Sequence, residues 1–437
     1  MFPLTIEDLN KAISDLAIMD ITTATIRQIG ALAAELELKA ADKMVHLEIG
    51  NPGLPAEETG VKAEIEALKR GVANIYPNIA GIPPLKQAGH DFIKSFLDIE
   101  ISPKGIIPTV GSMQGSFTLM LLLGQRIKGK DTMLFLNPGF PAQRNQAKVL
   151  GLKEAAFDIY AYRGRALEEK LESILKEGNV TGMIYSNPNN PAWTNLTEEE
   201  LEIIGRLATK YDVIVLEDLA YFGMDFRTDI SKPGVMPFGS TVARYTDNYI
   251  LLLSGSKIFS YAGQRIALVC MSDSVRRRKY KALADFYEMP SFGDAYVMGV
   301  LYCVSSGTSH SAQYALAEML DKAAKGELPF IEKTKEYALK AEKAKKLFLK
   351  HGFHLVYEYD GDQPISDGFF FTVGYHGMTG HEIQLELLRT GIATISLASA
   401  GSEQPGVRVC VSMLKGDEDF ERLDTFLRNF AEAHGNQ

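Results

Sequence analysis

Apolar and polar positions alternate in blocks through the middle of the chain, between about residues 106 and 272. Six short runs there are apolar on both faces and alternate with helical patterns; they cover residues 106–110, 132–136, 182–186, 213–217, 249–253 and 267–271. Buried strands separated by helices predict a mostly parallel sheet that is covered on both sides. We therefore predict an α/β fold whose large domain has three layers.

One connecting helix has a clear start signal. Thr197 and Glu200 have the spacing of a capping box, in which two side chains bond to the backbone at the first turn. An apolar stripe at helical spacing follows, formed by Leu201, Ile204, Leu207 and Ala208. Further helices are expected from Ser112 onward and over residues 141–150.

The two ends of the chain follow a different pattern. Residues 1–45 read as helical, and residues 50–55 contain two glycines and two prolines that interrupt regular structure. After about residue 310, a long charged helix at 331–351 precedes an alternating stretch at 368–373. This change indicates a second, smaller α+β domain.

Composition narrows the classes of function. The 437 residues are 46% hydrophobic and 23% charged, as in a globular protein long enough for two domains. Net charge is −9 and no run of five or six like charges occurs, so no basic patch for nucleic acid is indicated. The N-terminus carries acids early, unlike a signal peptide, and no segment approaches the ~20 apolar residues of a membrane span.

Cysteine and histidine usage adds two expectations. The three cysteines, Cys270, Cys303 and Cys410, are far apart and odd in number, which favours a reducing, cytoplasmic compartment over a disulfide framework. His351 and His354 have a possible ligand spacing but lie beside a glycine at an expected helix end. We therefore predict no metal site.

Candidate chemistry lies at the carboxyl ends of the predicted strands, where open parallel sheets bind ligands. The strand at 249–253 leads into residues 254–265, which contain Lys257, several hydroxyls, a glycine and Arg265. An amine at the end of a buried strand can lose its proton by desolvation and form an imine with a carbonyl cofactor, and the hydroxyls with Arg265 can hold a phosphate. The alternative is a surface turn with a solvated lysine and arginine.

Other strand ends carry compatible groups. The turn at 111–115 has backbone N–H groups and the Ser112 hydroxyl for a phosphate, and Phe140 could stack on a flat heterocycle or belong to the core. Asp218 could hold a protonated ring nitrogen, with Tyr221 on a ring oxygen, or could simply cap a helix.

Two more segments present polar groups. The segment 187–193 has two Asn-Pro pairs that fix an irregular loop presenting amides. Arg408 lies inside an apolar strand and needs an anion, either a ligand carboxylate or an internal salt-bridge partner.

Taken together, these residues resemble the class I/II aminotransferase family of fold-type I pyridoxal-phosphate enzymes, from about Leu47 to Ser412. The resemblance implies that Lys257 is the Schiff-base lysine and that Asp218 and Tyr221 are the other catalytic residues. The positions that match cofactor-binding residues of the family are Lys257, Ser112, Met113, Phe140, Asn190, Asp218, Tyr221, Ser254, Arg265 and Tyr76. Those that match substrate-binding residues are Arg408 for the α-carboxylate, Gly50 and Asn190.

The resemblance also implies architecture and assembly. A large cofactor-binding domain is expected over residues 51–305, and a small domain over 1–50 and 306–437. Tyr76 matches a tyrosine that reaches the phosphate of the neighbouring subunit, which implies a homodimer with shared sites. One departure is notable: the usual Asn-Pro-Thr-Gly reads Asn-Pro-Ala-Trp at 190–193, which introduces the only tryptophan of the chain.

The implied activity is transfer of an amino group from an L-amino acid to a 2-oxo acid by a ping-pong mechanism. A β-lyase or decarboxylase would use the same residues and stays open. A cofactor-binding regulator would need a basic DNA-binding extension, which the acidic N-terminal segment does not supply. The substrate side chain also stays open, because Arg27, Arg163 and Arg165 are interpreted as surface residues.

Overall fold

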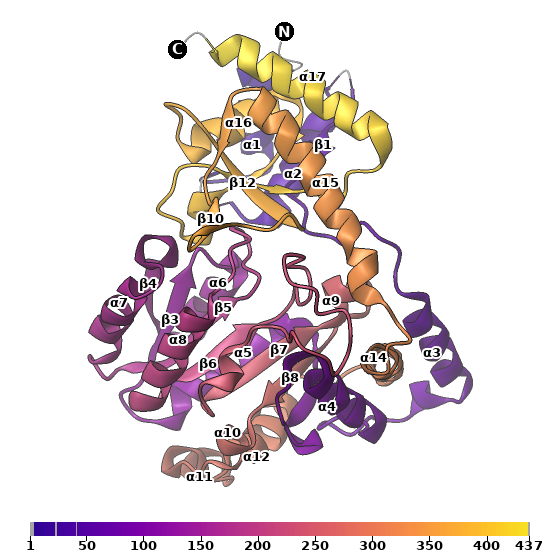
Figure 1. The fold of residues 1–437 in the computed structure, drawn as a ribbon, viewed down its shortest axis with the longest axis vertical. Coiled ribbons are helices and arrows are strands. Elements are labelled where there is room, and N and C mark those ends of the chain that lie inside the picture. Colours follow the sequence, from indigo (N-terminus) through magenta and orange to yellow (C-terminus); the bar gives the residue numbers. More distant parts are fainter. Residues whose placement is uncertain (1–3, 22–23, 41, 436–437) are drawn as a thin grey trace.

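A seven-stranded sheet forms the centre of the larger domain (Figure 1). The computed structural model describes residues 4–21, 24–40 and 42–435. In spatial order the strands are β2 (Ile106–Val110), β8 (Ile266–Met271), β7 (Tyr249–Ser254), β6 (Ile214–Asp218), β5 (Val180–Ser186), β3 (Thr132–Asn137) and β4 (Lys153–Asp158). Among these strands, β8 runs in the direction opposite to the other six. The prediction of a mostly parallel sheet is confirmed, although β4 was not predicted.

Alternate residues of each strand point to opposite faces, and helices cover both. In β3, Leu134 and Leu136 join one core cluster, whereas Met133 and Phe135 join another. The helices of the first face are α4 (Pro83–Leu97), α7 (Ala166–Leu175), α8 (Glu198–Lys210) and α14 (His310–Ala324). Those of the second face are α5 (Gly111–Arg126), α6 (Pro141–Val149), α11 (Lys281–Tyr287), α12 (Phe292–Asp294) and the π-helix η6 (Ala295–Leu301). The three-layer prediction is thereby confirmed.

Helix α8 begins as its sequence predicts. The Thr197 hydroxyl accepts from the Glu200 backbone N–H, and the Glu200 carboxylate accepts from the Thr197 N–H. The four residues of the predicted stripe are fully buried. The remaining helices of this part of the chain are α3 (Glu58–Lys69), α9 (Gly255–Ile258), α10 (Asp273–Arg277) and α13 (Tyr302–Val304).

The smaller domain combines both ends of the chain (Figure 1). Its antiparallel sheet has the order β14 (Ile395–Ser396), β15 (Val407–Cys410), β12 (Phe370–Tyr375) and β9 (Phe353–Leu355). Its helices are α15 (Phe330–Lys350), α16 (Gly380–Thr390) and α17 (Gly416–His434), joined by α1 (Ile6–Asp15) and α2 (Ile26–Glu37). Strand β1 (Val45–His46) pairs with β13 (Ile392–Ala393), and β10 (Tyr359–Asp360) forms a hairpin with β11 (Gln363–Pro364).

The exact domain boundaries stay predictions. Helix α14 begins after the predicted boundary at residue 305, yet it packs against α3 and α4. Its residues Leu316 and Leu320 belong to the core cluster of the large sheet. This packing favours a boundary between α14 and α15.

Candidate active site

The carboxyl ends of the parallel strands open into a cleft of about 1400 Å³ that is lined by residues of both domains. Ten of the predicted site residues line it: Gly50, Ser112, Phe140, Asn190, Asp218, Tyr221, Ser254, Lys257, Arg265 and Arg408. Met113 and Tyr76 are not in the described lining. Residues from seven segments of the sequence therefore meet in one place.

Lys257 lies in α9, the first turn after β7. Its Nζ donates to the carbonyl oxygen of Gly50, and it lies 5.4 Å from the centroid of the Phe369 ring. Desolvation lowers the pKa of Lys257 to about 8, and the positive charges of Arg408 and Arg265 act in the same direction. About a tenth of this amine is therefore neutral, and nucleophilic, at pH 7, far more than for an ordinary lysine.

Asp218 is the last residue of β6 and is buried. Its carboxylate accepts from Gln143 Nε2 at 2.9 Å and from the Ala220 backbone N–H at 3.1 Å. Burial raises the pKa of Asp218 to about 6, because these neutral donors offset only part of the desolvation. A cation placed against Asp218 would therefore gain from a carboxylate that has been removed from water.

A chain of polar contacts joins Tyr221 to Arg408. The Tyr221 hydroxyl accepts from Asn190 Nδ2 at 3.4 Å, and Asn190 Oδ1 accepts from Arg408 Nη1 at 3.1 Å. Arg408 Nη2 donates to the carbonyl oxygen of Glu48, and the guanidinium lies 4.6 Å above the Phe370 ring. Burial raises the pKa of Tyr221 and lowers that of Arg408.

The partners that Arg408 has are thus neutral oxygens rather than the carboxylate of an internal salt bridge. Its buried Nε has no hydrogen-bond partner among the described residues. A buried guanidinium with unused donor capacity is suited to an incoming carboxylate.

Hydrogen-bond donors suited to a phosphate lie at the other end of the cleft. Ser254 caps α9 by accepting from the Ser256 N–H at 3.2 Å, and Arg265 adopts a left-handed φ of 50°. A Cβ on Gly111, whose φ is +70°, would lie 2.4 Å from Arg265 Nη2. The guanidinium therefore lies close against the N-terminus of α5, beside Ser112. Hydroxyls, an arginine and free helical N–H groups converge here, as in an anion site.

Two predicted cofactor residues are not part of the described lining of the cleft. Tyr76 is 90% exposed, beyond the 3-10 turn Val72–Asn74. Met113 lies in the first turn of α5, where its carbonyl oxygen accepts from Gln146 Nε2 at 2.8 Å. Their roles stay predictions, and that of Tyr76 requires a second subunit.

Basic residues of two further segments line the cleft. Arg144 and Lys148 of α6 were not among the candidates from the sequence, whereas the start of α2 includes the candidate Arg27. Arg27 is exposed, as expected, and it lies in the lining of the cleft. The capping pair Thr25 and Gln28 marks where α2 begins, although it does not indicate where the helix lies relative to the sheet.

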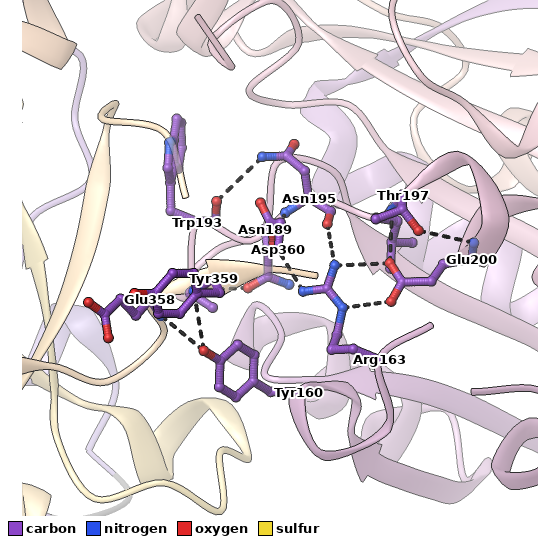
Figure 2. A network of polar contacts seen from close by, with 12 residues as sticks. Tyr160, Arg163, Asn189, Trp193, Asn195, Thr197, Glu200, Glu358, Tyr359 and Asp360 are labelled. Carbon is purple, nitrogen blue, oxygen red and sulfur yellow. Dashed lines mark hydrogen bonds and ion pairs between the residues drawn. The ribbon is translucent and has the colours of Figure 1, made fainter. Parts of the chain in front are cut away.

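The other two arginines differ from each other. Arg165 is exposed and pairs with Glu199 at 3.3 Å, as a surface residue would. Arg163 lies instead in a largely buried ion cluster with Glu200 and Asp360 (Figure 2). Its interpretation as a surface residue is therefore wrong, because its partner Asp360 is far away in the sequence.

Comparison with known proteins identifies relatives along most of the chain. The chain is 27% identical over 262 residues to an aspartate aminotransferase of Pyrococcus horikoshii, covering 60% of this chain and 63% of that protein. It is 25% identical over 412 residues to a (5-formylfuran-3-yl)methyl phosphate transaminase of Methanocaldococcus jannaschii, covering 92% and 96%. Several curated relatives, including the Pyrococcus protein, are matched over less than two thirds of their own length.

A solved structure shows the same fold. Aspartate aminotransferase from Thermus thermophilus with maleate superposes with a TM-score of 0.73 at 18% identity, covering 98% of this chain and 100% of that one. Residues 42–419 match the family described as aminotransferase class I and II. The chain therefore belongs to the class I and II aminotransferase family.

Proposed function

We propose that the protein is a pyridoxal-phosphate-dependent aminotransferase that moves an amino group from an L-amino acid to a 2-oxo acid by a ping-pong mechanism. The observation that carries this proposal is the convergence of Lys257, Asp218 and Arg408 on one cleft. A reactive amine, a buried acid and a buried guanidinium are the groups that this chemistry needs at separate points.

The residues present fit pyridoxal phosphate. Arg265, Ser254, Ser112 and the N-terminus of α5 would hold its phosphate, and Phe140 would lie against its ring. Asp218 would accept from the ring nitrogen, and a positive charge there relieves the cost of burying this carboxylate. When bound, the cofactor supplies a carbonyl carbon and a ring that withdraws electrons from the substrate.

The chain itself would perform three tasks. Arg408 binds the α-carboxylate of the amino acid and thereby sets the direction of its Cα–H bond. Lys257 Nζ removes the proton from Cα, and its lowered pKa keeps part of the amine unprotonated for this step. Asp218 would hold a proton on the ring nitrogen of the cofactor, and Tyr221 and Asn190 would donate to its ring oxygen.

We also propose a homodimer in the cytoplasm. The exposed Tyr76, together with exposed Met298, Tyr302 and Val304 on η6 and α13, supports a subunit contact. Cys270, Cys303 and Cys410 are free thiols. Within the residues that the structure describes, no helix is long and apolar enough to cross a bilayer. Analytical ultracentrifugation tests the dimer.

Half-reactions test the activity. Purified protein loaded with pyridoxal phosphate is mixed with each of the twenty amino acids, with and without 2-oxoglutarate, and followed by absorbance. Conversion of the cofactor to its amine form by a donor, reversed by the 2-oxo acid, supports the proposal. Pyruvate and ammonia without an acceptor would indicate a β-lyase instead. Acidic donors are the first candidates, because Arg27 and Lys148 add positive charge to the cleft.

A further inference from the structure

Trp193 occupies the position where the family usually has a glycine, and its backbone retains a conformation that favours glycine. Its φ is +63°, in the left-handed region that bulky residues rarely adopt, and its side chain is fully buried. An unfavourable backbone conformation persists only where surrounding contacts hold it in place. The contacts of Trp193 therefore indicate what the substitution provides.

The side chain of Trp193 crosses from the large domain into the smaller one. Its Nε1 donates to Ser366 Oγ at 3.1 Å. Its ring lies directly against Gly368, where a Cβ would come within 2.1 Å of Trp193 Cζ2. Both partners belong to the segment that leads into β12, so the indole packs into a slot in the smaller domain that a side chain at Gly368 would block.

The same ring lies behind two residues of the cleft wall. The ring centroid of Trp193 is 5.5 Å from that of Tyr221 and 5.9 Å from that of Phe370, both in edge-to-face geometry. Tyr221 and Phe370 line the cleft, and the guanidinium of Arg408 packs over the ring of Phe370. Trp193 thus contacts both the tyrosine of the large domain and the aromatic support of Arg408.

A cluster of charged side chains binds the backbone of Asn195, two residues after Trp193 in the same loop (Figure 2). Asp360 Oδ1 accepts from the Asn195 backbone N–H at 2.9 Å and from Arg163 Nη1 at 3.0 Å. Arg163 Nη2 donates to the Asn195 carbonyl at 2.7 Å, and its guanidinium also pairs with the fully buried Glu200. Both backbone groups of Asn195 are therefore held by this cluster, and its member Asp360 belongs to the β10–β11 hairpin.

We propose that Trp193 is a positioning residue which, held by the Asp360 cluster, fixes the spacing between Tyr221 and Arg408 across the two domains. It sets how the substrate carboxylate is held without contacting the substrate. This role rests on the proposed aminotransferase function. It also makes the only tryptophan of the chain a natural fluorescent reporter of the contact between the domains.

The first test separates positioning from stability. Trp193→Gly suits the left-handed backbone conformation, which offsets part of the cost of the cavity that the lost ring leaves, and circular dichroism checks that the variant folds; the substitution removes the ring behind Tyr221 and Phe370. We expect KM for the amino donor to rise about tenfold and kcat to fall less than about threefold. Trp193→Phe keeps an aromatic ring and should restore KM to within about threefold of the wild-type value. A drop in kcat alone, with KM unchanged in Trp193→Gly, would overturn the proposal.

The second test needs neither cofactor nor substrate. Asp360→Asn weakens the clamp but leaves Arg163 paired with Glu200. Acrylamide should quench Trp193 fluorescence about threefold more strongly in this variant than in the wild-type apoprotein, because the loop opens more often. Arg165→Ala, which removes an exposed ion pair of the same region, is the matched control and should match wild type. Wild-type quenching in Asp360→Asn would exclude the clamp.

The two proposals can fail separately. A wild-type protein that transfers no amino group refutes the aminotransferase function, and the role in substrate binding falls with it. A wild-type protein that is active, but whose KM is insensitive to Trp193→Gly, refutes only the positioning role.

Discussion

The wall of the cleft that the large domain provides differs from the wall that the smaller domain provides in how its residues are held. Asp218 is the last residue of β6 and Lys257 lies just after the neighbouring strand β7, so the backbone hydrogen bonds between these strands fix the relative positions of the two residues. Arg408 instead depends on Asn190 and Glu48, which precede it by 218 and 360 residues. The large-domain wall is therefore in place once the sheet has formed. The wall of the smaller domain also requires the two domains to pack against each other.

Among changes to the large-domain wall of the cleft, Lys257→Ala is expected to reduce activity most. Loss of the amine removes the base at the substrate Cα, so the rate of amino transfer should fall by at least about 10³-fold. Steady-state assays measure this, with circular dichroism as the check on folding. Lys325→Ala, which changes an exposed lysine paired with Asp321, should keep full activity. Residual activity above a few per cent of wild type would contradict the role of Lys257.

The corresponding change in the other wall is Arg408→Lys. The charge remains, but the planar fork that can bind a carboxylate with two bonds is lost, so kcat/KM for the amino donor should fall about 10²-fold. Affinity of the apoprotein for pyridoxal phosphate, titrated by absorbance, should stay near the wild-type value. Equal losses in both measurements would mean that the two walls are not independent.

A smaller effect is expected from Gly111→Ala, which tests the anion-binding end of the large-domain wall. In Gly111→Ala the new methyl group would meet Arg265 Nη2 at 2.4 Å, and the φ of +70° adds backbone strain. The affinity of the apoprotein for pyridoxal phosphate should fall about tenfold. KM for the amino donor in the saturated enzyme should change little. Gly129→Ala, at a similar positive φ with open space around it, controls for the strain alone.

The smallest expected effect concerns pH. The lowered pKa of Lys257, about 8, means that raising the pH from 7.5 to 8.5 increases the neutral amine about threefold, with little further gain above pH 9. The rate at which the apoprotein captures pyridoxal phosphate should follow this curve in stopped-flow absorbance. An ordinary lysine would instead give about a tenfold gain over the same interval and keep rising toward pH 10.

The large-domain wall could be predicted residue by residue because its groups directly follow apolar strands. Strand β4 escaped prediction because Lys153, Glu154 and Ala156 are exposed at the sheet edge, so it lacks the continuous apolar run of a central strand. The reversed direction of β8 was also not readable from its composition, which matches that of the parallel strands.

Contacts between the domains could not be predicted from the sequence, for a different reason. The substitution at Trp193 is visible in the sequence, yet its slot is formed by Ser366 and Gly368, more than 170 residues away. Arg163 likewise pairs with Asp360 across 197 residues. Local periodicity carries no information on which distant segments meet, so residues of this kind are found only in the folded structure.

The antiparallel direction of β8 has a consequence for how the site assembles. Because β8 turns back along β7, with Ser254 opposite Ala267, Arg265 returns to the edge of the sheet where Ser254 lies. Serine and arginine are only eleven residues apart, so bringing them together closes a short loop at a small entropic cost. The contact of Arg408 with Asn190 closes a loop of more than two hundred residues. Contacts that are local in sequence form early in folding, so the anion-binding end is expected to be organised before the carboxylate-binding end exists.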